Sequence, residues 1–64
     1  MLVKIRLNCL IFEGLDLGQK MFIEKWAGNV VIFETENGWK VEGKKDELFA
    51  LLYELSKAYD IELV

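Results

Sequence analysis

Histidine is absent from this chain, so the side chain that most often serves as general base and metal ligand is missing. Serine occurs once, as Ser56, with no histidine to activate its hydroxyl. The glycines Gly14 and Gly18 lack the Lys-Ser or Lys-Thr ending of a phosphate-binding loop. We therefore expect no enzymatic activity, no catalytic residues and no cofactor.

Clusters of metal-ligating side chains are equally scarce. The candidate acidic pairs are Asp46 with Glu47 and Glu34 with Glu36. The first pair falls at a predicted helix start, where acids favour the helix dipole, and the second lies on a solvated strand face. Neither pair is expected to bind a metal ion.

Cysteine also occurs once, as Cys9, which rules out an intramolecular disulfide. A short chain without disulfides indicates a reducing compartment, so we expect a cytoplasmic protein. Cys9 alternates with apolar residues and is interpreted as a small buried hydrophobe. Every apolar run is far shorter than the roughly 18 residues of a membrane span. Lys4, Arg6 and Asn8 interrupt the first apolar residues, unlike the charges of a secretory leader.

What the chain has in surplus is apolar side chains. Its 64 residues are 53% hydrophobic, and 8 basic against 11 acidic residues give a net charge of −3. So short a chain forms one domain, residues 1–64, close to the lower size limit for folding unaided. A small core cannot take up the whole surplus, so self-association or a partner is its simplest outlet. The acidic balance argues against a dedicated nucleic-acid binder, whose affinity depends on neutralising phosphates.

Residues 45–59 form the segment whose pattern admits a single interpretation, an amphipathic helix. Asp46 and Glu47 at its start and Lys57 near its end follow the order that favours the helix dipole. Apolar residues recur at the three- and four-residue spacing of one helix face: Leu48, Leu51, Leu52, Leu55, Ala58 and Tyr59.

Residues 2–13 predict one continuous strand. Lys4, Arg6 and Asn8 alternate with a strictly apolar set, Val3, Ile5, Leu7, Cys9 and Ile11. At Leu10 and Phe12 the second face becomes apolar too, so the far end of this strand is apolar on both sides.

Residues 16–27 fit two structures. Met21, Phe22, Ile23 and Trp26 suit a strand, whereas Asp16 could cap a short helix that ends before residue 28. The strand is preferred because it fits the turns that follow, although it places Glu24 on the supposed core face.

Two turns support an antiparallel meander. The Gly-Asn pair at 28–29 matches a two-residue hairpin loop, and the Glu-Asn-Gly run at 36–38 matches a three-residue loop whose glycine is left-handed. These loops set Thr35 opposite Trp39 and Phe33 opposite Val41. One face then collects Phe22, Trp26, Val31, Phe33, Trp39 and Val41.

We therefore predict an α+β domain, an antiparallel β-meander of about four strands packed against one C-terminal helix, in the order β-β-β-β-α. The alternatives are β-α-β-β-α and an SH3-like small barrel with a C-terminal helix. Residues 61–64 either extend the helix or form a short final strand. In element order, residues 20–58 resemble the small archaeal chromatin proteins with an SH3-like barrel. Those proteins are strongly basic, so the resemblance implies a fold and not their DNA binding.

The second face of the predicted sheet has the composition of an interaction surface, with large apolar residues at its centre and charges toward its edge. We predict a small non-enzymatic protein–protein interaction module, a homodimer that regulates or inhibits a larger protein. A closed barrel would instead bury the same residues. The alternative function is nucleic-acid binding through Trp26, Trp39 and neighbouring lysines. The residues predicted for interaction are Leu10, Phe12, Met21, Ile23, Val30 and Ile32.

Overall fold

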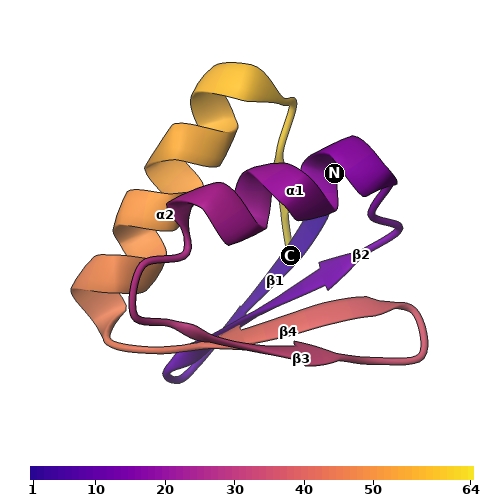
Figure 1. Ribbon diagram of the computed structural model, residues 1–64. Coiled ribbons are helices and arrows are strands. Elements are labelled where there is room, and N and C mark those ends of the chain that lie inside the picture. Colours follow the sequence, from indigo (N-terminus) through magenta and orange to yellow (C-terminus); the bar gives the residue numbers. More distant parts are fainter.

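The computed structural model describes all of residues 1–64 and is an α+β fold, which confirms the predicted class. Both helices lie on one side of a five-stranded mixed sheet, and the other side carries no further element (Figure 1). The strand order is β3-β4-β2-β1-β5, with β5 parallel to β1 and the other pairs antiparallel. The elements are β1 (Leu2–Arg6), β2 (Cys9–Glu13), α1 (Leu17–Trp26), β3 (Val31–Glu34), β4 (Gly38–Glu42), α2 (Lys45–Ala58) and β5 (Glu62–Leu63).

The predicted order β-β-β-β-α is therefore replaced by β-β-α-β-β-α-β. The sheet is open, with β3 at one edge and β5 at the other, so the SH3-like barrel is also wrong.

The single strand predicted for residues 2–13 is a hairpin. It turns at Leu7 and Asn8, and Asn8 adopts φ 61°, a left-handed conformation that asparagine tolerates better than most residues. The turn sets Ile5 opposite Leu10 and Val3 opposite Phe12. The side chains that face the helices are thus odd-numbered in β1 and even-numbered in β2, which explains why the second set of positions becomes apolar at Leu10 and Phe12.

The strand preferred for residues 19–27 is wrong, and the helical alternative is correct. The Asp16 carboxylate accepts a hydrogen bond from the Gln19 backbone N–H at 2.8 Å, and the Gln19 side-chain oxygen accepts one from the Asp16 N–H at 3.0 Å. This reciprocal capping satisfies donors that a helix start leaves free. Ile23 is fully buried, whereas Glu24 is solvent-exposed. The Gly-Asn pair at 28–29 consequently leads out of α1 and forms no hairpin.

The hairpin between β3 and β4 exists, but its register differs by one residue from the prediction. Thr35 donates its N–H to the Gly38 carbonyl, and Glu34, not Thr35, lies opposite Trp39. Because side chains alternate along a strand, this shift moves Phe33 to the sheet face opposite the core.

Helix α2 confirms the amphipathic helix predicted at residues 45–59, ending one residue earlier. Leu48, Leu51 and Leu55 are buried, and Leu52 packs partly against the core. The chain then returns to β1, where residues 62–63 form the short final strand that was one of two alternatives. Neither helix is long and apolar enough to cross a membrane.

The core lies between the sheet and the two helices. Phe22 on α1 packs edge-on against Tyr59 at the end of α2, with ring centroids 5.5 Å apart, and joins the two helices. The buried cluster consists of Val3, Leu10, Phe12, Ile23, Trp39, Val41, Leu48, Leu51 and Leu55.

Truncating a fully buried side chain of α2 is expected to cost a large part of the stability. Leu55→Ala should lower the free energy of unfolding by about 2–5 kcal/mol, because it removes buried methyl groups and leaves a cavity. Tyr53→Ala, on the exposed side of the same helix, is the control and should cost much less. Urea unfolding followed by tryptophan fluorescence measures both. Equal costs would contradict the packing described here.

Gly38 is not left-handed, as the turn rule predicted, and is needed for a different reason. A Cβ at this position would overlap the backbone carbonyl of Phe12 on β2. Gly38→Ala should therefore destabilise the protein by about 3 kcal/mol, since a backbone neighbour cannot move aside. Gly28→Ala is the control. Gly28 has φ 59° and open space around it, so only the conformational cost of about 1 kcal/mol is expected. Thermal melts of the two variants should differ in this order.

Candidate functional site

The structure divides the six residues predicted for interaction between the core and the surface. Leu10, Phe12 and Ile23 belong to the buried cluster. Val30 and Ile32 are partly buried against that cluster, and Met21 is exposed on α1. The six residues therefore do not form one open face. Most of them lie in or against the core between the sheet and the helices. Three features cause this: the hairpin at Leu7, the helix at residues 17–26 and the shifted register of β3.

The face that the helices leave open is largely polar. Lys4 and Glu13 form an ion pair at 2.7 Å, and Lys40 and Glu42 form one at 3.0 Å. The hydrogen bond and charge of Glu42 raise the pKa of the Lys40 ammonium above its usual value. Cys9 lies on this face and is buried, as predicted. Apolar exposure on this face is greatest on β3.

Strand β3 forms one open edge of the sheet. The Thr35 N–H donates to the Gly38 carbonyl of β4. Because hydrogen-bonded pairs alternate along an antiparallel ladder, the backbone groups of Val31 and Phe33 also bond to β4. The backbone groups of Ile32 and Glu34, which lie between them, point away from the sheet. The side chains of Val31 and Phe33 are 53% and 45% exposed. Natural proteins protect such edges with charged residues, lysine above all, or with proline; β3 carries one charge, on Glu34 at its end, and neither lysine nor proline.

The opposite edge is only partly covered. Strand β5 pairs with Leu2 and Val3, and the Val3 carbonyl accepts a hydrogen bond from the Val64 N–H at 2.9 Å. Two residues further along β1, the backbone groups of Ile5 point in the same direction. The Ile5 carbonyl accepts a hydrogen bond from the guanidinium of Arg6, its neighbour in β1, at 2.9 Å in an exposed position.

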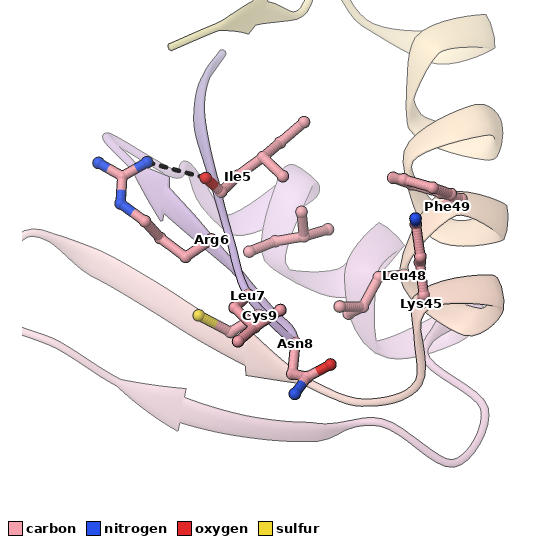
Figure 2. A pocket seen from close by; sticks show the side chains of 9 residues that line it. Ile5, Arg6, Leu7, Asn8, Cys9, Lys45, Leu48 and Phe49 are labelled. Carbon is pink, nitrogen blue, oxygen red and sulfur yellow. Dashed lines mark hydrogen bonds between the residues drawn. The ribbon is translucent and has the colours of Figure 1, made fainter.

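Beside this edge lies an apolar depression that we call the edge groove. It consists of two hollows that share Phe49. The first has a volume of about 130 Å³ and lies between the β1–β2 hairpin and the start of α2, with Leu48 and Phe49 across from Ile5 (Figure 2). The second, of about 400 Å³, continues along α2 toward β5. Its lining residues are Phe49, Leu52, Tyr53, Ser56, Ile61 and Leu63.

The two charged side chains that line the edge groove are both basic. Among the residues that line the two hollows, only Arg6 and Lys45 are charged, and both are basic. Neither takes part in any of the ion pairs, which involve Lys4, Lys40 and Lys57. In a chain with a net charge of −3, the charged side chains that line this groove are therefore both basic.

Phe49 and Tyr53 are the groove residues that sequence reasoning missed. They are 46% and 63% exposed and lie four residues apart on α2, beside the apolar stripe that packs on the sheet. This second aromatic stripe at helical spacing was the available signal.

The aromatic and basic residues of the nucleic-acid alternative are dispersed. Trp39 is only 7% exposed, and its buried indole N–H has no hydrogen-bond acceptor. Trp26 is 46% exposed on α1, with the Lys25 ammonium 5.7 Å from its ring centre. The two tryptophans therefore do not present a shared stacking surface.

Comparison with known proteins gives no family assignment. No protein-family model, curated protein or solved structure matches this chain.

Proposed function

We propose that this protein is a small non-enzymatic protein–protein interaction module that self-associates and regulates or inhibits a larger protein. The observation that carries the proposal is the unprotected edge of β3, where backbone donors and acceptors lie beside exposed Val31 and Phe33. An exposed edge of this kind is a template for pairing with another strand.

Two copies can pair through β3 about a twofold axis. With Ile32 opposite Ile32 of the second copy, the two residues exchange both of their outward backbone hydrogen bonds. Val31 then lies opposite the second copy's Phe33, and the reverse pair forms by symmetry. Each such contact between a β-branched and an aromatic side chain contributes about 0.2–1 kcal/mol. Glu34 of each copy then lies opposite Val30 of the other. The pairing therefore places no two charges of the same sign opposite each other.

A second copy fits the β1 edge less well. With Ile5 on the twofold axis, Lys4 would lie opposite the second copy's Arg6, and this would occur twice. Like charges directly opposite one another destabilise a strand pair. The β3 edge is therefore the proposed self-association surface, and the edge groove is left for the larger partner.

Light scattering coupled to size-exclusion chromatography tests the self-association. The wild-type protein is expected to elute as a dimer at micromolar concentration and to dissociate on dilution. Phe33→Glu should shift it to the monomer, because the new carboxylate faces Val31 across the interface. Within the chain this carboxylate lies beside Lys40, so the fold is expected to survive.

Phe49→Glu is the matched control, since Phe49 is 46% exposed and lies in the edge groove instead of on β3. This variant should remain dimeric. A wild-type monomer at every concentration would contradict self-association. A dimer that survives Phe33→Glu and is lost in Phe49→Glu would contradict the assignment to β3.

A further inference from the structure

We propose that the free part of the β1 edge, together with the edge groove, binds an extended segment of another protein in which acidic and apolar residues alternate. The segment adds as a strand beside residues 4–6 and inserts its apolar side chains between β1 and α2. This inference rests on the proposed function in that it assigns the surface for the larger partner. Strand addition of this kind draws affinity from backbone hydrogen bonds and specificity from alternate side chains.

The chain itself already contains a strand of this type on the same edge. In β5, Leu63 lies opposite Val3 and lines the edge groove, whereas Glu62 lies opposite Leu2 on the open face of the sheet. The strand that pairs with this edge thus has its acidic residue on the open face of the sheet and its apolar residue in the edge groove. A partner strand that continues the line of β5 along β1 would meet Ile5 and Phe49 on the groove side.

The charge of the groove indicates why the outer residues should be acidic. Arg6 alternates with Ile5 along β1 and therefore projects to the open face of the sheet, where the outer residues of an added strand also lie (Figure 2). The Arg6 guanidinium donates a hydrogen bond to the Ile5 carbonyl. An added strand would need this same carbonyl as the acceptor for one of its backbone N–H groups. A partner that supplies both a backbone N–H for this carbonyl and a carboxylate for Arg6 replaces the exposed hydrogen bond with two interactions.

A synthetic peptide of the predicted pattern tests the proposal. The probe is acetyl-Glu-Leu-Glu-Val-Glu-Leu-amide with a fluorescent label, and its binding is measured by fluorescence anisotropy. Saturable binding is expected, with shifts of the Ile5 and Phe49 backbone amide signals in NMR spectra. A peptide with lysine in place of each glutamate, and one N-methylated along its backbone, should bind at least about tenfold more weakly because each loses a charge-assisted or backbone hydrogen bond.

Variants of the protein separate this site from other surfaces. Arg6→Ala is expected to reduce the affinity for the probe by about tenfold, as loss of a hydrogen bond to a charged group does. Phe49→Ala should reduce it as well, because Phe49 faces the inner apolar side chains of the added strand. Lys25→Ala is the matched control, because Lys25 is also basic and outside any ion pair but lies on α1. Thermal melts verify that each variant folds.

Phe33→Glu distinguishes the two proposals, because it should abolish the dimer and leave binding of the probe unchanged. No binding of the glutamate probe at millimolar concentration would overturn the present inference while leaving self-association intact. Equal binding of the glutamate and lysine probes would also overturn it, as would unchanged affinity in Arg6→Ala and Phe49→Ala.

Discussion

The position of β2 between β1 and β4 is the constraint on which the rest of the structure depends. Its inward side chains, Leu10 and Phe12, decide which residues of both neighbours are buried, because directly opposite residues share a face. Val3 and Trp39 are buried for this reason. Both helices then cover that one face, and no element remains for the other face or for the two edges. The surfaces offered for interaction are consequences of how the core is filled.

The two edges of the sheet differ in chemistry, and this difference is why we propose a different partner for each. The edge at β3 is apolar and lacks cations of its own, so a second copy meets no repulsion there. The edge at β1 carries Lys4 and Arg6, which disfavours self-pairing and favours an acidic strand. A chain of 64 residues can thus use separate sheet edges for self-association and for a different protein. The apolar surplus of the composition is divided between these edges and the core.

Local patterns predicted the α+β class and α2, because one apolar stripe of four leucines has a single interpretation. The same patterns also contained two signs that the strands predicted at residues 2–13 and 16–27 were wrong. The appearance of apolar residues on both faces from Leu10 onward marks the hairpin, and Glu24 on a supposed core face indicates that its segment is not a strand. The register of β3 was not accessible, since Gly38 is fixed by its approach to Phe12, far away in the sequence. The edge groove was equally inaccessible because it depends on pairing between the two ends of the chain.

Strand β5 is held by few bonds, and all of them lie at the rim of the sheet. Glu62 and Val64 donate to carbonyls of Met1 and Val3, and the amino group of Met1 donates to Asp60. Such short, exposed pairings open more readily than the core of a sheet. When β5 detaches, the whole of β1 becomes a free edge. A partner segment long enough to reach Leu2 and Val3, if the proposed strand addition holds, would compete with β5 for one surface, and its apparent affinity would scale with the fraction of molecules in which β5 is open.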